Sequence, residues 1–216
     1  MKSYKRQAGF TLVEIAIVLV IIGLLLGAIL KGQELIENSR AKNAINEVSS
    51  IKAAHYSYMD RYKRLPGDDG NLPALQARGG NWASVTLQGN ANGVIGPIAN
   101  PFAATGEGIA YFQHLRAAGF ITGDPAATGA AALPRNAFGG LTGIMNGLNP
   151  GYTQNTLQIC QGNVPGKAAS AIDSQGDDGR PNSGTVRATL GANNTAPGAA
   201  ATAYDEGQAY TVCTAI

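Results

Sequence analysis

The chain has 216 residues and a formal net charge of +2, and 14% of its residues are charged, well below the usual quarter. Its 29 Gly and 10 Pro follow no three-residue period, which excludes a collagen-like chain. A net charge this small does not attract a polyanion over the whole surface, and we expect no nucleic-acid partner. The length suits one modest domain with an appendage.

A short basic segment precedes a long apolar run at the N-terminus. Residues 1–9 carry Lys2, Lys5 and Arg6 and no acid, and residues 10–30 read FTLVEIAIVLVIIGLLLGAIL. As a helix this run measures roughly 31 Å, which matches a hydrocarbon core of about 30 Å. Because basic flanks stay cytoplasmic, we expect one span with the rest of the chain outside. A conventional signal peptide is the alternative, but its apolar stretch is only about 7–15 residues long and ends in small residues.

Glu14 lies inside the apolar run. An ionised carboxylate in hydrocarbon costs about 2.5–3.5 kcal/mol unless it finds a partner. If the chain were cut between Gly9 and Phe10, the new α-amino group of a neighbouring copy could supply that partner and fix the axial register of the subunits. The alternative is an acid that is tolerated near the membrane surface.

The residues GFTLVE, with the basic leader before them and the aliphatic run after them, resemble the type III signal of type IV prepilins and type II secretion pseudopilins. The resemblance implies that a prepilin peptidase cuts after Gly9 and methylates Phe10, and that Glu14 guides assembly with other pilin or pseudopilin subunits. It also implies an inner-membrane assembly platform, and membrane lipid as the partner before assembly. The expected location is the bacterial inner membrane, with the C-terminal domain periplasmic, and then a periplasmic or cell-surface filament.

Two glycines bear on the kind of subunit. Gly23-x-x-x-Gly27 permits close contact between helices. Many major pilins carry a helix-disrupting Pro shortly after a glycine in this part of the helix, and this sequence has no Pro between residues 10 and 65. The difference favours a pseudopilin or a minor pilin over a major type IV pilin.

The helix is expected to continue beyond the membrane as an amphipathic helix. Its apolar residues recur mainly three or four apart, at Leu35, Ile36, Ala41, Ile45, Val48, Ile51, Tyr58 and Tyr62. Pro66 and Gly67 end it, because proline cannot continue the hydrogen-bond ladder. We therefore expect a leader over residues 1–9, a long helix over 10–64 with its transmembrane part over 10–30, and an extracytoplasmic domain over 65–216.

That domain is rich in Gly, Ala, Asn, Thr and Pro, which predicts long loops. A second helix is predicted over residues 107–118 with Gly119 as its stop, and short strands are predicted over 83–87, 143–148, 156–160, 184–190 and 209–214. These elements predict an α+β fold in which a small antiparallel sheet packs on the amphipathic half of the long helix. The stretches RLPGDDGN and DDGRPNSGTVRA also resemble segments common in pseudopilin-like proteins.

Cys160 and Cys213 are the only two cysteines, and both lie on the segment expected outside the cytoplasm, where disulfides persist. We expect them to be paired, with two free buried thiols as the alternative. A disulfide near the C-terminus also resembles the pattern of many pilins.

No catalytic constellation stands out. His55 and His114 are the only histidines, and a packed or solvated imidazole explains each better than catalysis does. The carboxylates of Asp68, Asp69, Asp173, Asp177 and Asp178 could hold Ca²⁺ in loops or form turns beside glycine, and their spacing is not that of an EF-hand.

We therefore expect a structural subunit and not an enzyme, with no catalytic residue, no resident metal and no cofactor. The alternative class is a domain permanently tethered to the membrane that binds a periplasmic ligand or acts as an enzyme. That alternative leaves Gly9, Phe10 and Glu14 unexplained.

Overall fold

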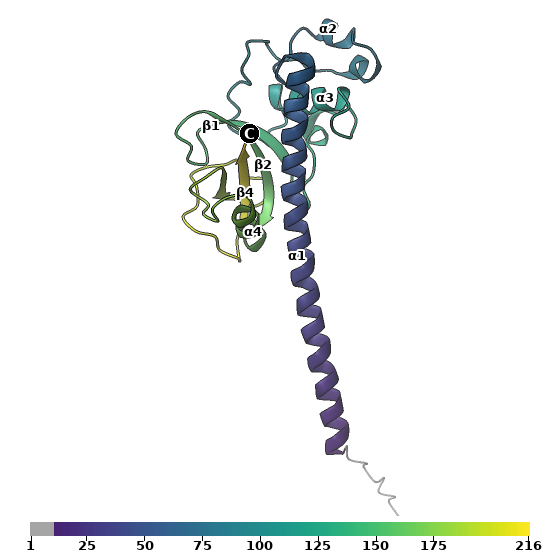
Figure 1. Ribbon diagram of the computed structural model, residues 1–216, viewed down its shortest axis with the longest axis vertical. Coiled ribbons are helices and arrows are strands. Elements are labelled where there is room, and N and C mark those ends of the chain that lie inside the picture. Colours follow the sequence, from purple (N-terminus) through teal and green to yellow (C-terminus); the bar gives the residue numbers. More distant parts are fainter. Residues whose placement is uncertain (1–10) are drawn as a thin grey trace, which may run out of the picture. The chain divides into compact units, whose positions relative to one another are not determined.

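The computed structural model describes residues 11–216 (Figure 1). Its contacts divide the chain into a part that ends at Ser39 and a part that runs from Arg40 to Ile216, and each is described by itself. Helix α1 (Leu12–Tyr62) contributes to both parts. Gly9 and Phe10 lie outside the described residues.

The first part consists of the N-terminal turns of α1. Residues 11–30 are all exposed, and α1, to which this stretch belongs, is long and apolar enough to cross a membrane. Leu35 and Ile36, expected on the apolar stripe, are exposed as well.

The end of α1 comes slightly before the expected boundary at residue 64. The helix ends at Tyr62, and Lys63 adopts the left-handed conformation with a φ of 54°. The Lys63 N–H still donates to the Met59 carbonyl at 2.9 Å, which closes the last turn. Pro66 and Gly67 were expected to end the helix, but the left-handed Lys63 has already ended it three residues before Pro66.

The second part combines short helices with one antiparallel sheet. In chain order it contains α2 (Leu72–Gln76), η1 (Gly80–Ser84), α3 (Gly106–Ala117), η2 (Gly129–Ala132), β1 (Thr142–Gly147), β2 (Thr156–Pro165), α4 (Gly166–Gly176), β3 (Val186–Leu190) and β4 (Ala209–Ala215). The strand order is β1-β2-β4-β3, and every pair is antiparallel. This is the expected α+β, pilin-like architecture.

The sheet and the second half of α1 share an apolar interior that consists of two clusters. One face of α1 is buried from Ala41 onward, at Ala41, Ala44, Val48, Ile51, Ala54, His55 and Tyr58. Val48, Ile51 and Tyr58 belong to the larger cluster, together with α3 and strands β1 and β2. Ala41 and Ala44 belong to a second cluster with α4, β3 and β4. The small side chains at these two positions allow α1 to lie close to its neighbours.

Helix α3 ends where the sequence predicted. Gly119 has a φ of 77°, and the N–H of Phe120 reaches back to the Leu115 carbonyl at 3.0 Å. That pattern is a glycine-terminated helix end of the Schellman type.

The strand predicted over residues 83–87 is wrong. Ser84 ends the 3₁₀ helix η1, and the N–H groups of Thr86 and Leu87 both donate to the side-chain oxygen of Gln113, at 3.2 and 3.0 Å. A buried side chain from α3 thus satisfies the backbone groups that a neighbouring strand would have paired. Two further differences concern elements that the sequence did not predict in full: β2 continues to Pro165, and helix α4 follows it directly.

Candidate functional site

The N-terminal end of α1 is closed by a reciprocal pair of residues, Thr11 and Glu14. The backbone N–H and the hydroxyl of Thr11 both donate to Oε2 of Glu14, each at 2.7 Å. The Glu14 N–H donates back to Oγ1 of Thr11 at 3.2 Å. This is a capping box, in which each side chain satisfies a backbone N–H that the helix itself leaves unpaired.

The carboxylate of Glu14 keeps capacity for another partner. Both bonds from Thr11 go to Oε2, and neither uses Oε1. The sequence placed Glu14 as an expensive charge in an apolar run, and the structure shows that its helix end partly compensates that charge. The role of Thr11 was not predicted, although the Thr-x-x-Glu spacing from Thr11 to Glu14 is the signature of such a cap.

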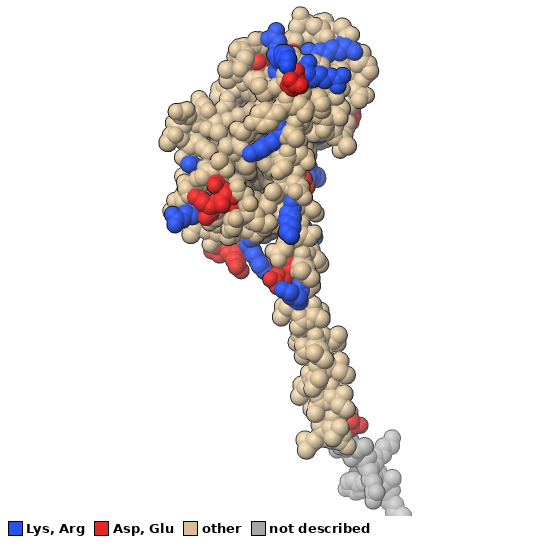
Figure 2. Space-filling view, viewed as in Figure 1, with Lys and Arg blue, Asp and Glu red and all other residues tan. Residues whose placement is uncertain are grey.

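An apolar segment, residues 12–30, follows this cap. Glu14 is its only charged side chain, and large hydrophobic residues stand fully outward, such as Leu12 at 92% exposed and Leu24 at 71%. Figure 2 shows the segment as tan atoms with one red group near its start. Such a surface requires lipid or other apolar helices around it.

The glycines of α1 leave its backbone accessible. A methyl group added at Gly23, Gly27 or Gly32 would meet nothing within 4 Å. Open positions of this kind let a neighbouring helix approach closely, and interfaces between membrane helices use small residues for that purpose.

The two cysteines form a disulfide. Cys160 on β2 and Cys213 on β4 stand directly opposite each other in the antiparallel register, and both are fully buried. The bond joins β2 and β4, the two central strands of the sheet, and confirms the predicted pairing.

The two histidines are packed into the interior. His114 accepts the Gly67 N–H on Nδ1 at 3.0 Å and contacts the Leu87 carbonyl through Nε2 at 3.1 Å, so the neutral ring with its proton on Nε2 satisfies both partners. His55 lies 3.3 Å from the Tyr111 hydroxyl. Burial lowers the pKa of both rings, that of His55 to about 4. These contacts give the imidazoles a structural role.

The aspartates that the sequence offered as a calcium site are engaged in turns. Asp68 accepts the N–H groups of Asn92 and Gly93 at 3.1 and 2.8 Å, and Asp69 accepts the Tyr58 hydroxyl at 2.8 Å.

The second aspartate group is used in the same way. Asp173 accepts the Tyr204 hydroxyl at 2.6 Å, and Asp178 accepts the Arg180 N–H at 2.9 Å. Within residues 11–216 no group of three or more His, Cys, Asp or Glu side chains is arranged to hold a metal ion. Asp68 and Asp178 accept backbone N–H groups of loops, whereas Asp69 and Asp173 accept tyrosine hydroxyls distant in the sequence.

One arginine with a structural role escaped the sequence argument. The guanidinium of Arg78 contacts the rings of both Tyr62 and Trp82, 4.7 and 4.5 Å from their centroids, and donates to Asp69 at 2.8 Å. It fastens the segment after α2 to the end of α1. No spacing in the sequence predicts this contact, because the residues that form it come together only in the folded chain.

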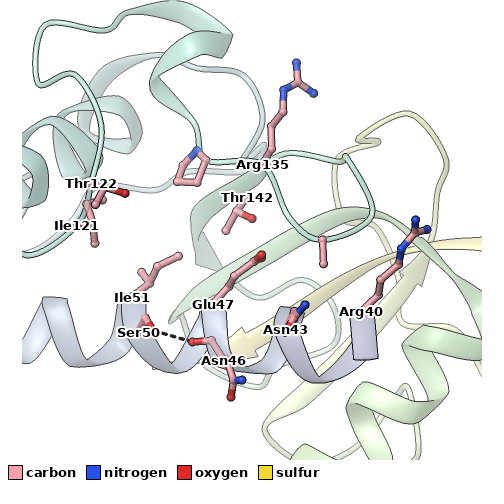
Figure 3. A pocket seen from close by; sticks show the side chains of 12 residues that line it. Arg40, Asn43, Asn46, Glu47, Ser50, Ile51, Ile121, Thr122, Arg135 and Thr142 are labelled. Atoms are coloured by element: carbon pink, nitrogen blue, oxygen red, sulfur yellow. Dashed lines mark hydrogen bonds between the residues drawn. The ribbon is translucent and has the colours of Figure 1, made fainter. Parts of the chain in front are cut away.

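A groove of about 690 Å³ lies beside α1 in the second part (Figure 3). It is lined by Arg40, Asn43, Asn46, Glu47, Ser50, Ile51, Ile121, Thr122, Pro134, Arg135, Ala137 and Thr142. The groove was not predicted, because its walls come from segments about 70 to 100 positions apart in the sequence.

The comparisons with known proteins bear on the N-terminus. Residues 4–30 match the prokaryotic N-terminal methylation motif, the prepilin signal of type IV pilins and pseudopilins. No curated protein and no solved structure gives a match. The match covers Gly9, Phe10, Glu14 and the apolar segment, and residues 31–216 lie outside it.

Proposed function

We propose that this chain, which carries the prepilin signal, is a pseudopilin or minor pilin: a structural subunit of a type IV-like filament that assembles through α1. A prepilin peptidase cuts it after Gly9 and methylates Phe10. The leader is then residues 1–9, the long helix spans 10–64, and residues 65–216 form the extracytoplasmic domain.

The proposal rests on one observation: the methylation motif coincides with an exposed apolar helix whose first turn contains Glu14, a member of the helix cap. The motif covers residues 4–30, and the exposed segment covers residues 12–30. Before assembly, membrane lipid covers this segment, with the basic leader on the cytoplasmic side. In the filament, the helices of other subunits cover it, so little hydrophobic free energy is lost on leaving the bilayer.

Glu14 is proposed as the residue that sets the docking register. Its carboxylate is expensive in hydrocarbon and still has an oxygen that Thr11 does not use. The methylated amine of a neighbouring Phe10 is a cation that suits this oxygen. The inner-membrane assembly platform would lift the subunit to the position where the two charges meet.

The test is mass spectrometry of the N-terminal peptide from the protein isolated from its native cells. A peptide that begins with N-methylated Phe10 supports the proposal. An intact leader, in cells whose prepilin peptidase is active on another substrate, contradicts it and points to a domain permanently tethered to the membrane.

A further inference from the structure

The groove beside α1 has two distinct ends. Figure 3 shows Ile51, Ile121 and Thr122 gathered at one end and Arg40 at the other end, while Arg135 stands on the wall opposite α1 with its side chain pointing away from that helix. Nη1 of Arg135 donates to the Gly139 carbonyl at 3.0 Å. Arg40 and Arg135 are exposed, and neither forms an ion pair among residues 11–216. The groove therefore combines an apolar end with two guanidinium groups that have no acidic partner in the described part of the chain.

A buried hydroxyl in the groove wall lacks a partner. Thr142 is 1% exposed, and its Oγ1 has no hydrogen-bond partner among the described residues. A buried polar atom without a partner destabilises the fold, because it has lost its bonds to water without replacement. An occupant that brings a backbone N–H or C=O to this wall would remove that destabilisation.

The single acid in the groove is already engaged. Oε2 of Glu47 accepts the side-chain amide of Gln161 at 3.2 Å, and that amide also reaches the Ala44 carbonyl. Glu47 repels a carboxylate that settles beside it, so an acidic occupant must place its charge toward Arg40 and Arg135 instead.

The same chain presents an acidic turn elsewhere on its surface. Asp205 and Glu206 are exposed, and neither lines the groove of its own chain. Glu206 forms no ion pair among residues 11–216. Oδ1 of Asp205 accepts the Gly207 N–H at 2.9 Å within the turn, as the Asp177 and Asp178 carboxylates accept bonds within their own loop, so Glu206 is the acid of the turn for which no bond is found in the described residues.

The turn is held in one conformation. The Gln208 N–H donates to the Asp205 carbonyl at 3.2 Å, and the Asp205 N–H donates to the Tyr210 hydroxyl at 2.7 Å. A methyl group at Gly166 would stand 1.9 Å from the Asp205 carbonyl oxygen, so the turn packs tightly on the start of α4. A rigid acidic turn loses little conformational entropy when it binds.

We infer that the groove receives the Asp205–Glu206 turn of a second copy of this chain. The Glu206 carboxylate meets Arg135 and the Asp205 carboxylate meets Arg40, and the methyl groups of the exposed Thr202 and Ala203, which precede the turn, face the apolar end. The groove and the turn are different surfaces, so the contact is heterologous and can repeat from copy to copy without closing. This inference rests on the proposed function, because only a filament places many copies in one repeating relation.

A zero-length crosslink tests the contact directly. Cells co-express the wild-type chain with a variant that carries Arg135→Lys and Glu206→Gln, and a carbodiimide then couples amines to carboxylates in isolated filaments. A peptide with Arg135→Lys joined to Glu206 must come from two copies, because the variant chain has lost that carboxylate. The matched control replaces Arg135→Lys with Arg64→Lys, an exposed arginine outside the groove.

We expect the crosslink from position 135 and not from position 64. Its absence in filaments that contain both chains overturns the inference, and so does an equal yield from the control.

Charge reversal tests the contribution of the contact to assembly. Arg135→Glu and Glu206→Arg should each lower the share of copies in the filament fraction about tenfold, and the double variant should return within about twofold of wild type. Arg64→Glu should assemble normally. If Arg135→Glu also assembles normally, or if the double variant is no better than the singles, the inference is wrong.

The two proposals fail in different ways. An unmethylated chain with its leader intact contradicts the filament function and the inference together. Methylated chains in filaments without the crosslink contradict the inference alone.

Discussion

Oε2 of Glu14 receives two hydrogen bonds from Thr11, so the apolar helix begins with a carboxylate whose charge is already partly stabilised by its own chain. Charge-assisted bonds of this kind are stronger than neutral ones. The arrangement lets the glutamate reside at the edge of an apolar segment before any other subunit is present. It also separates two roles of Glu14, as a helix cap and as a charge for a neighbour.

Substitutions at the two positions separate those roles. Glu14→Ala and Glu14→Gln should leave cleavage after Gly9 intact and abolish incorporation into filaments, because both remove the charge. Thr11→Ala removes the cap at a cost of about 1 kcal/mol and keeps the charge, so it should assemble near the wild-type level. The measurement is the filament fraction together with the N-terminal mass. Normal assembly of Glu14→Gln would show that the charge is not needed.

The Arg78 contact should dominate the stability of the segment that follows α1. Arg78→Ala removes both ring contacts and leaves the buried Asp69 carboxylate without its cation, which should lower the free energy of unfolding by roughly 2–3 kcal/mol. Arg78→Lys keeps the charge but not the planar stacking and should cost roughly half as much. Trp82, the only tryptophan, lies against Arg78, so its fluorescence reports denaturant unfolding of the full chain at this contact.

The exposed Arg64 provides the control for that series. Arg64→Ala should change the free energy of unfolding by less than about 0.5 kcal/mol. Equal effects of Arg78→Ala and Arg64→Ala would mean that the stacked arginine contributes no more than an ordinary surface charge.

Much of the fold could be predicted because its signals are local. The apolar run and its three-to-four periodicity predict α1, and Gly119 marks the end of α3. Residues 83–87 misled the prediction because Val85 and Leu87 alternate as in a strand, while Gln113, distant in sequence, takes the N–H groups of Thr86 and Leu87. Helix α4 was missed because its short Ala-rich sequence is flanked by glycines, and packing against the sheet stabilises it.

The candidate site divides in the same way. Glu14 is predictable because a lone charge in an apolar run is conspicuous in the sequence itself. The groove and the Arg78 contact are not, because their members are brought together only by the folded chain. Thr11 lies between these cases. Its spacing to Glu14 is the signature of a helix cap, but Glu14 was interpreted only as a charge in an apolar run.

Acid should weaken the fold through His55. Burial lowers the pKa of this ring from 6.5 to about 4, so the unfolded chain binds a proton at a pH where the folded chain does not. The contribution of His55 is therefore fully present above about pH 6.5 and is lost as the pH falls toward 4, by roughly 3 kcal/mol in total. Burial raises the pKa of Glu47 and Asp173, which acts in the opposite direction.

The measurement is therefore a difference between two proteins. The free energy of unfolding of wild type and of His55→Gln is followed from about pH 7 to about pH 4. Glutamine can keep a hydrogen bond to Tyr111 and does not titrate, so the gap between the two curves should shift by the amount given above. Parallel curves would show that His55 is not the titrating group.

Two glycines on β1 provide a matched pair for the packing of the sheet. A methyl group at Gly143 would stand 2.0 Å from the Pro101 carbonyl oxygen, whereas at Gly147 it would meet only the flexible end of Met145 at 3.4 Å. Neither glycine has a positive φ, so the two substitutions differ in contact and not in backbone strain.

Gly143→Ala should lower the free energy of unfolding by roughly 2–4 kcal/mol, because rigid backbone must move. Gly147→Ala should stay within about 0.5 kcal/mol of wild type. Thermal denaturation of both variants decides the point, and equal melting temperatures would mean that the loop carrying Pro101 does not pack on β1 in solution.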